Sequence, residues 1–346
     1  QRAWGDNCIL LAQRWIARLT VTPSPSPSST PTASPSPTTS PTSSPSPSPT
    51  ASPSPLPTPS PSPTPTPGPT VPSGCALPLY PTPDCTGVPA GWTPTRIING
   101  DYTASLNGEL IDGWRITGSL LIRAQNVVVR NSEVFTRIYN QASGVAYNGL
   151  VIVDTTIGPP SGVSNATTGA IGVCGYVARR VEIRNAPEGW RVGGDGYSGG
   201  RCGPVEISDS YARLRSTGNC DHNDGVQGYD EPPGTVIAHN TIDMSNVGCS
   251  TGAIYVGDPY GATVVDNLLL GGSYVMRLHS SGTQTNYPAV TGNRIVNGAW
   301  DYGPVLVDAC STIAVWRGNT VVEIDADYQV TSTVRRLTTC AEAIFA

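Results

Sequence analysis

The sequence predicts an all-β fold in which short strands stack into a solenoid. Three observations support this prediction. Val and Ile alternate with other residues in short runs, and a period of two residues is that of a strand with one buried face. Glycine is abundant, at 38 residues. A phrase of the form apolar-x-apolar-x-Asn/Asp-x-x-apolar also recurs, as expected when each unit buries its apolar face only against its neighbours.

Two segments precede the repeats and are not expected to join the solenoid. Residues 1–21 are too few to fold alone, and their apolar run CILLA is shorter than the core of a signal peptide. We interpret them as the stump of an upstream module or of an imperfect gene start, and the odd cysteine, Cys8, lies there. Residues 22–73 are almost purely Pro, Ser and Thr, which favours an extended linker of up to about 150 Å. Such linkers join modules of secreted proteins.

Residues 74–346 form the predicted solenoid domain. The repeated phrase is found eight times, for example as VVVRNSEV, VIAHNTI and TVVDNLLL, with anchors 23, 31, 24, 31, 27, 26 and 26 residues apart. The eight anchors are Asn131, Asp154, Asn185, Asp209, Asn240, Asn267, Asn293 and Asn319. Asn and Asp tolerate a left-handed backbone and bond nearby backbone groups, so we place each anchor at a turn between two strands. The alternative, an antiparallel sandwich, needs hairpin turns at shorter, regular spacing.

The repeat resembles that of the right-handed parallel β-helix proteins of the pectate-lyase-like superfamily. This resemblance implies three strands per coil, about 8–10 coils and an asparagine ladder at one turn. It covers nearly the whole domain, but it specifies the fold better than the activity.

Eight cysteines of the domain are expected to form disulfides. As sequence neighbours they lie 10, 28, 29 and 30 residues apart, without the C-x-x-C motif of zinc or redox sites. Sequence alone leaves 105 pairings open. The β-helix resemblance favours Cys174/Cys202, Cys220/Cys249 and Cys310/Cys340, because a bridge of about 29 residues would link equivalent positions of adjacent coils.

The charge composition excludes several classes of function. All twenty basic residues are Arg, and the chain has no Lys, so mechanisms that need a lysine, such as P-loops and Schiff bases, are excluded. The domain holds 17 Arg and 24 acids, a net charge of −7, which argues against nucleic acid as a partner. No apolar run approaches the ~20 residues of a membrane span. We expect a secreted monomer.

Stacking the coils predicts one polar face. The strands that precede the anchors include NDGVQGYD, GAIYVGD and YVMRLHS, and equivalent residues of consecutive coils would lie about 4.8 Å apart. The predicted inward residues are Ile171, Val192, Val226, Ile254, Met276 and Val305. The predicted outward columns are Gln227, Tyr255, Arg277 and Leu306, and beside them Tyr229, His279 and Asp308.

Further polar residues border this face, and together they predict a groove for a long glycan. His222 and Asp224 begin the strand, Asp230 and Asp258 close it in successive coils, and Arg191 and Asp195 lie one coil earlier. Simpler structural roles stay open. Asp224 precedes a glycine as in many turns, His222 is flanked by polar residues, and Tyr255 can be an aromatic surface platform. His239 lies inside a repeated phrase, and we expect a structural role for it.

Members of the superfamily commonly cleave or epimerise acidic polysaccharides. On this basis we expect a polyuronate lyase or epimerase that abstracts the C5 proton of a uronate. Arg277 would hold the carboxylate, His279 or His222 would be the base, Tyr255 the acid, and Asp224 a further catalytic group. Gln227, Tyr229, Arg191 and Asp308 would bind the substrate. Asp230 and Asp258, with Asp224 and Asp308, are candidate Ca²⁺ ligands because calcium prefers hard oxygens.

Two alternatives remain from the sequence. A hydrolase would use a pair of carboxylates, for which Asp224 and Asp258 are the candidates. NDGVQ resembles the NTDG segment of polygalacturonase-like hydrolases, and RLH stands where that family has Arg-x-Lys, but the Asp-Asp pair and the Gly-His-Gly motif are missing. The second alternative is a β-helix adhesin whose groove binds glycans without turnover.

Overall fold

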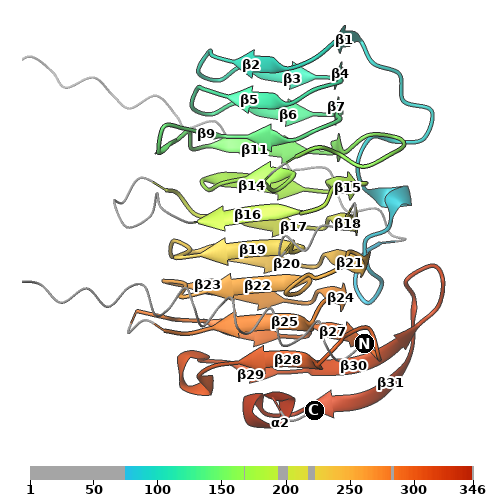
Figure 1. Cartoon of the computed structure of the whole chain (residues 1–346), viewed down its shortest axis with the longest axis vertical. Helices are drawn as coiled ribbons and strands as arrows, with labels where there is room; N and C mark the ends of the chain where they lie inside the picture. Colours follow the sequence, from blue (N-terminus) through green and yellow to red (C-terminus); the bar gives the residue numbers. More distant parts are fainter. Residues whose placement is uncertain (1–74, 167, 194–201, 217–222, 282–283, 345–346) are drawn as a thin grey trace, which may run out of the picture. The chain divides into compact units, whose positions relative to one another are not determined.

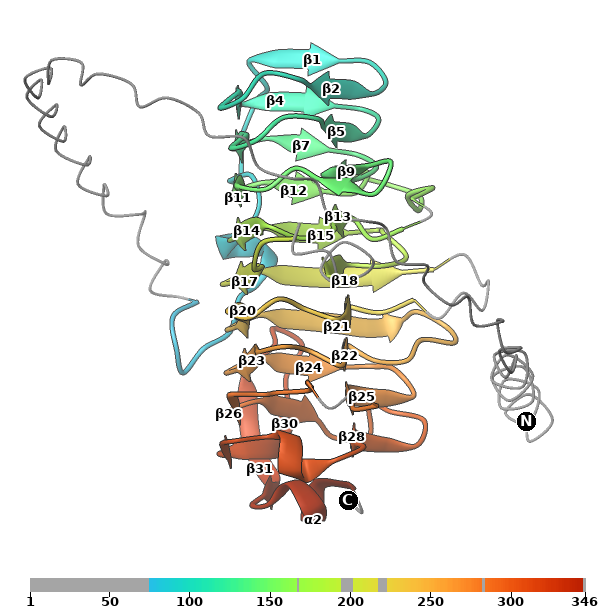
Figure 2. The same ribbon diagram turned by 90° about the vertical axis from the view of Figure 1, so that its left-hand side faces the viewer.

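The chain folds as a parallel β-solenoid, as predicted. The computed structural model describes residues 75–166, 168–193, 202–216, 223–281 and 284–344, all of them within one compact unit, Pro65–Ala346. The coils stack along one axis, from β1 at one end to β31 and a short helix at the other (Figures 1 and 2).

Most coils contribute one strand to each of three parallel sheets. Sheet A contains β1 (Arg96–Ile98), β4 (Trp114–Ile116), β7 (Glu133–Val134), β12 (Thr156–Ile157), β15 (Glu182–Arg184), β18 (Tyr211–Arg215), β21 (Thr241–Asn246), β24 (Leu268–Leu270), β27 (Arg294–Val296), β30 (Asn319–Ile324) and β31 (Val330–Leu337). Sheet B contains β2 (Tyr102–Ala104), β5 (Leu120–Ile122), β8 (Ile138–Tyr139), β13 (Ile171–Gly172), β16 (Trp190–Gly193), β19 (Val226–Tyr229), β22 (Ile254–Gly257), β25 (Tyr274–His279) and β28 (Gly303–Val307). Sheet C contains β3 (Leu110–Asp112), β6 (Val128–Arg130), β11 (Leu150–Val153), β14 (Tyr176–Arg179), β17 (Glu206–Ser208), β20 (Thr235–Ala238), β23 (Ala262–Val265), β26 (Ala289–Thr291) and β29 (Trp316–Arg317).

A few elements depart from this plan. The last strand of sheet A, β31, pairs antiparallel with β30, and β9 (Gln141–Ala142) with β10 (Val145–Ala146) forms a small hairpin. Among the described residues, the helices are η1 (Pro83–Cys85), η3 (Cys310–Thr312) and α2 (Cys340–Ile344).

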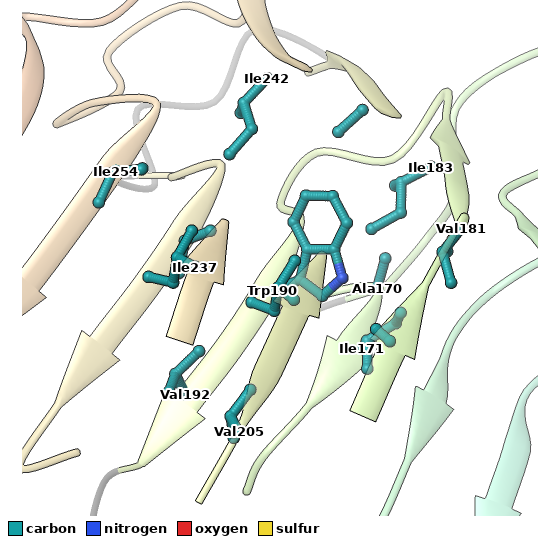
Figure 3. Close-up of a cluster of buried hydrophobic side chains, with 14 of the residues drawn as sticks. Ala170, Ile171, Val181, Ile183, Trp190, Val192, Val205, Ile237, Ile242 and Ile254 are labelled. Atoms are coloured by element: carbon teal, nitrogen blue, oxygen red, sulfur yellow. The ribbon is translucent and has the colours of Figure 1, made fainter. Parts of the chain in front are cut away.

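The core fills the space between the three sheets. All six residues predicted to point inward are buried, and Figure 3 shows several of them around the indole ring of Trp190. One detail of the prediction was wrong, because Trp190 rather than Val192 pairs with Val226, and Val192 pairs with Gly228. Both positions face inward, since a shift of two residues preserves the side on which a strand residue points.

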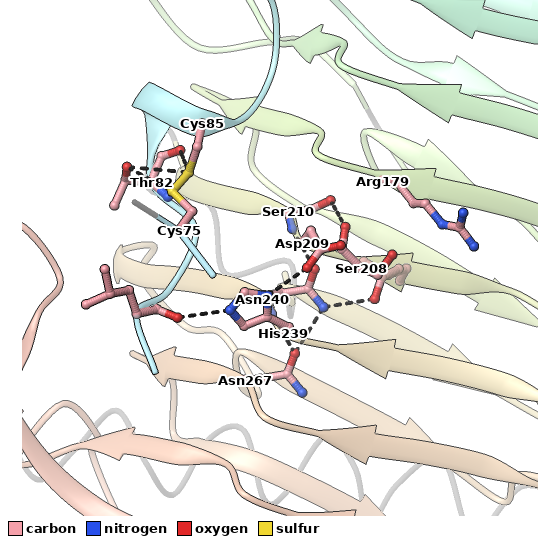
Figure 4. A network of polar contacts seen from close by, with 12 residues as sticks. Cys75, Thr82, Cys85, Arg179, Ser208, Asp209, Ser210, His239, Asn240 and Asn267 are labelled. Atoms are coloured by element: carbon pink, nitrogen blue, oxygen red, sulfur yellow. Dashed lines mark hydrogen bonds and ion pairs between the residues drawn. A yellow bond between two sulfur atoms is a disulfide. The ribbon is translucent and has the colours of Figure 1, made fainter. Parts of the chain in front are cut away.

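An asparagine ladder runs along the turn between sheets C and A. The backbone N–H and the Nδ2 of Asn240 both donate to Oδ1 of Asn267 at 3.0 Å. The same pair of bonds joins Asn267 to Asn293 and Asn293 to Asn319, and all four side chains are almost fully buried. Figure 4 shows the first members of this ladder. Each amide thus satisfies backbone groups that the turn leaves out of the sheets.

The repeat anchors of the sequence fall at three different places. Four of them form the ladder. The position one residue before the ladder position is a turn with φ of 46° to 52°, and it is occupied by Asn131, Asp154 and Asp209. His239 and Asp266 share that position, with φ of 53° and 54°. This conformation favours Asn, Asp and Gly.

Asn185 lies at a left-handed turn between two strands, with φ of 50°, as predicted, but not at the same place in the coil as the other anchors. Asn185 follows β15 of sheet A, whereas the repeated turn follows sheet C. Arg180, with φ of 49°, holds the turn position in that coil and ion-pairs with Asp154 at 2.7 Å. A search for Asn or Asp does not find this position because an arginine occupies it. This explains the uneven spacing between the successive anchors that precede and follow Asn185.

Disulfides link several coils, as predicted. Cys75–Cys85, Cys174–Cys202 and Cys310–Cys340 are bridged. Cys249 is also disulfide-bonded, and Cys220 and Cys8 lie outside the described residues.

His239 attaches the N-terminal segment to the solenoid, which agrees with the structural role expected for it. Its Nδ1 is 2.7 Å from Asp209 Oδ1 and its Nε2 is 2.9 Å from the carbonyl of Leu79 (Figure 4). Within the described part of the chain, no helix is long and apolar enough to cross a membrane.

Candidate functional site

The predicted polar columns exist on the outer face of sheet B. The pairing of strands aligns Arg191 with Gln227, Gln227 with Tyr255, and Tyr255 with Arg277. Leu306 follows Arg277 in the same column. The neighbouring column includes Tyr229, Gly257, His279 and then Asp308 after the last strand. Residues far apart in the sequence therefore line one face of the molecule.

Asp308 joins two of the predicted catalytic residues. It accepts hydrogen bonds from Arg277 Nη1 at 2.6 Å and from Arg277 Nη2 at 3.2 Å. Its Oδ2 is also 2.5 Å from Nδ1 of His279. A proton on Nδ1 bonded to a carboxylate leaves Nε2 as the basic nitrogen of a neutral imidazole. We name Arg277, His279 and Asp308 the histidine cluster.

The other side of the His279 ring faces Asp258. Nε2 of His279 is 3.9 Å from Oδ2 of Asp258, which is too long for a hydrogen bond. Asp258 itself accepts bonds from the backbone and hydroxyl of Ser281 at 2.6 and 2.5 Å, and from Thr285 at 2.8 Å. Asp258 thus also fixes the loop that follows β25.

Two tyrosines extend the face next to the histidine cluster. The ring of Tyr255 stacks on the imidazole of His279 with centroids 6.5 Å apart and an angle of 18°. The ring of Tyr229 lies 5.2 Å from that of Tyr255 and is 41% exposed. Burial, followed by the effect of Tyr229, raises the pKa of Tyr255 above its ordinary value of 10. Tyr255 therefore keeps its proton near neutral pH.

Asp224 is enclosed behind this face rather than exposed on it. Its carboxylate is 1% exposed and accepts bonds from the N–H of Gly252 at 2.8 Å and from Nε2 of Gln227 at 3.0 Å. Burial raises the pKa of Asp224 to about 7, although these two bonds act in the opposite direction. In this geometry Asp224 does not reach a substrate on the face, but it holds the side-chain amide of Gln227. Its role is therefore to position Gln227.

The carboxylate pair considered for a hydrolase is not brought together. The N–H of Gly252 donates to the carboxylate of Asp224, and the N–H of Asp230 donates to the carbonyl of Gly257. In the strand register, Asp224 therefore lies opposite Gly252, and Asp230 lies opposite Asp258. Asp224 and Asp258 are thus six strand positions apart, on the order of 20 Å at ~3.3 Å per residue. A hydrolase needs carboxylates within about 10 Å.

A pocket of about 400 Å³ opens at the other end of the polar columns. It is lined by Tyr139, Gln141, Thr168, Val173, Arg191, Val192, Gly193, Gln227, Tyr229 and Asp230. Tyr139 precedes Arg191 by two coils in the column that contains Tyr255. The guanidinium of Arg137 lies over the ring of Tyr139, 4.7 Å from its centroid. The pocket has the mixture of aromatic and hydrogen-bonding groups that a sugar requires.

Arg191 is already paired. Its Nε is 2.5 Å from Oε1 of Glu188, a buried acid. Burial raises the pKa of Glu188, and the charge of Arg191 acts against this rise. Arg191 can bind an acidic sugar only if it shares its guanidinium with Glu188.

Calcium binding stays a prediction, and the residues suggested for it have other partners in the described structure. Both oxygens of Asp258 accept hydrogen bonds from N–H or O–H groups, and Asp308 is paired with Arg277. Across the described residues, no three His, Cys, Asp or Glu side chains form a group suited to a metal. Asp230 and Asp258 occupy left-handed turns, with φ of 50° and 52°, which gives both a structural reason to be Asp. His222 and Asp195 lie outside the described residues.

Sequence reasoning missed the buried groups behind the face. The hydroxyl of Tyr287 lies 2.9 Å from the carbonyl of Val256 and 3.0 Å from that of His279, so it fixes the backbone that carries the imidazole. The carboxyl of Glu231 is fully buried below Gly228, and burial raises its pKa well above the ordinary value. Neither residue belongs to the repeated phrase, so no signal in the sequence distinguished them.

Comparisons with family models, with curated proteins and with solved structures find no match. The resemblance to the pectate-lyase-like superfamily therefore stays a prediction beyond the β-solenoid itself, and the function has to be argued from the geometry of sheet B.

Proposed function

We propose that this chain is a secreted polysaccharide lyase or epimerase that abstracts the C5 proton of a uronate on the outer face of sheet B. The observation that carries the proposal is the histidine cluster, in which Asp308 binds Nδ1 of His279 and leaves Nε2, 3.9 Å from Asp258, as the nitrogen that can accept a proton. Proton abstraction next to a carboxylate requires a positioned base, and an imidazole whose other nitrogen is already bound is suited to that role.

The remaining groups supply the other parts of the reaction. Nε2 of His279 takes the C5 proton, and Asp308 and Asp258 stabilise the imidazolium that forms. In a lyase the C4–O4 bond then breaks as the C4=C5 bond forms, and the hydroxyl of Tyr255 protonates O4. In an epimerase C5 is reprotonated from the opposite side. Arg277 lies next to both rings, and it would bind the substrate carboxylate by sharing its guanidinium with Asp308.

The groove also suits a polymer. The 400 Å³ pocket at Tyr139 and Arg191 lies several coils from His279 along the same sheet, and coils are about 4.8 Å apart. Sugar units on either side of the reacting unit would contact Tyr229 and Gln227 between these two places. The disulfides favour an oxidising compartment, which supports secretion.

Hydrolysis is the second candidate, and a different pair of carboxylates favours it. Asp258 and Asp308 lie on the two sides of the His279 ring, and their two negative charges exceed the one positive charge of Arg277. An excess of carboxylates suits acid and base roles on a neutral glycan. Products distinguish the candidates, because only a lyase forms an unsaturated uronate.

The experiment uses the full chain with pectate, alginate and a neutral glycan. Absorbance of the unsaturated uronate, new reducing ends and exchange of the C5 proton with D₂O report lyase, hydrolase and epimerase activity. His279→Gln should lower the rate by at least about 100-fold, the usual effect of losing a general base, and Asp308→Asn should lower it as well. Asp301→Asn, which changes an exposed acid in the turn before β28, is the matched control.

Three results would overturn this assignment. Full activity of the His279→Gln protein would exclude His279 as the base. Reducing ends without unsaturated products would replace the lyase with the hydrolase. Glycan binding without any product would identify a binding protein.

A further inference from the structure

A cationic pocket lies on another face of the solenoid, close to its C-terminal end. It has a volume of about 440 Å³, and Arg294, Arg317 and Arg336 line it together with Thr320 and Thr338. These residues belong to β27, β29, β30 and β31 and to the segment after β31, so none lies on sheet B. We name it the arginine pocket.

The strand pairing explains how three arginines meet there. Arg294 of β27 is in register with Thr320 of β30, and Thr320 with Arg336 of the antiparallel β31. Arg317 ends β29, next to Gly318. Nη1 of Arg294 donates to the carbonyl of Gly318 at 2.8 Å and to that of Gly292 at 2.8 Å. These bonds fix one guanidinium while using only one of its nitrogens.

The charges of the pocket are not balanced by neighbouring acids. Within the described residues, none of these three arginines forms an ion pair, whereas five arginines of sheets A and B, from Arg115 to Arg277, do. The two acids closest in sequence have other partners, since Glu342 accepts bonds from Thr338 and Thr339 and Glu323 accepts one from Asn297. An unbalanced group of three cations is unexpected in a domain of net charge −7, because the acids outnumber the arginines.

A buried hydroxyl gives independent evidence for a ligand. Thr320 lies at the centre of the column between Arg294 and Arg336 and is only 9% exposed. Its Oγ1 is buried and has no hydrogen-bonding partner within the described structure. A buried polar group without a partner destabilises the folded state, and a ligand oxygen in the pocket would supply that partner.

We propose that the arginine pocket binds one compact oxyanion, namely a carboxylate, sulfate or phosphate group. Arginine forks bind such groups through paired, charge-assisted hydrogen bonds, and the hydroxyl of Thr320 donates one more. The anion is either free or part of an acidic sugar. A long polyanion is disfavoured, because the surrounding domain would repel the rest of it. This site does not depend on the function proposed for sheet B.

Calorimetric titration of the full chain with sulfate, phosphate and galacturonate tests the proposal, with sodium chloride holding the ionic strength constant. We expect one saturable site. Arg336→Gln should weaken binding at least about tenfold, since a hydrogen bond to a charged group is worth ~1.5–3 kcal/mol. Thr320→Val should weaken it while keeping the shape of the side chain. Arg335→Gln is the control, because it removes the same charge next to the pocket without lining it.

The outcomes are distinct. Tighter binding of galacturonate than of sulfate and phosphate identifies a sugar site, and the reverse identifies a site for the free oxyanion. Absence of saturable binding overturns the proposal, as does equal weakening by Arg335→Gln and Arg336→Gln. Unchanged melting temperatures show that the variants fold.

Discussion

Replacing Asn267 by Ala should strongly destabilise the solenoid. Asn267 is fully buried, and its side chain takes part in four hydrogen bonds of 3.0 Å. Its Oδ1 accepts two from Asn240, and its Nδ2 donates to the carbonyl of Ile237 and to Oδ1 of Asn293. The substitution removes all four and leaves the backbone groups of Asn240 and Ile237 buried without these partners.

The expected loss follows from this count. A hydrogen bond contributes about 1 kcal/mol net to stability, so four bonds give about 4 kcal/mol. Urea unfolding followed by circular dichroism and by tryptophan fluorescence measures the change, and agreement of the two probes shows whether the coils unfold together. Asn297→Ala is the control, since the exposed side chain of Asn297 makes one bond to Glu323 and should cost below about 0.5 kcal/mol. Equal losses in the two variants would refute the ladder as a source of stability.

Three further predictions concern groups away from the histidine cluster. Asp224 has a pKa raised from 3.8 to about 7, so the folded state keeps a proton that the unfolded state loses; stability should fall by up to about 4 kcal/mol as pH rises through this window. Asp224→Asn should remove that fall, and an unchanged pH dependence in urea unfolding would contradict it. Burial alone would lower the pKa of His239, but bonds to Asp209 and Leu79 outweigh burial and raise it. The protonated ring therefore stabilises the folded state at low pH, and this contribution is lost as the pH rises above the raised pKa. His239→Gln should therefore speed proteolysis of residues 75–85 mainly at acidic pH. Equal acceleration at all pH values would contradict the proposed attachment of this segment by His239. Removing Cys174–Cys202, which closes a loop of 28 residues, should cost about 3–4 kcal/mol; a loss below ~1 kcal/mol in urea unfolding would show that the bridge is not structural.

The sequence was sufficient for the fold because the solenoid repeats one simple rule. Alternating Val and Ile residues place the core, and equal spacing places the columns of sheet B, so Tyr255, Arg277 and His279 meet as predicted. Asn185 occupies a different left-handed turn, after sheet A, because the turn after sheet C requires a left-handed backbone rather than a particular side chain. Arg180 satisfies that requirement in its coil.

The details of the site could not be predicted because they depend on side-chain contacts between coils. The burial of Asp224 and its bond to Gln227 depend on how tightly the corner of the coil packs. Glu188 and Tyr287 lie outside the repeated phrase and reach the face only through folding. The same holds for the arginine pocket, since the antiparallel turn of β31 brings Arg336 to its place.

The most direct test of the account is a crystal structure of the His279→Gln chain with an oligouronate. We predict that the sugar lies along the outer face of sheet B, from the pocket at Tyr139 and Arg191 to the histidine cluster, with the C5 of one unit next to the position of Nε2. An oligouronate bound on sheet A or C, or crossing sheet B away from residue 279, would contradict the proposed site.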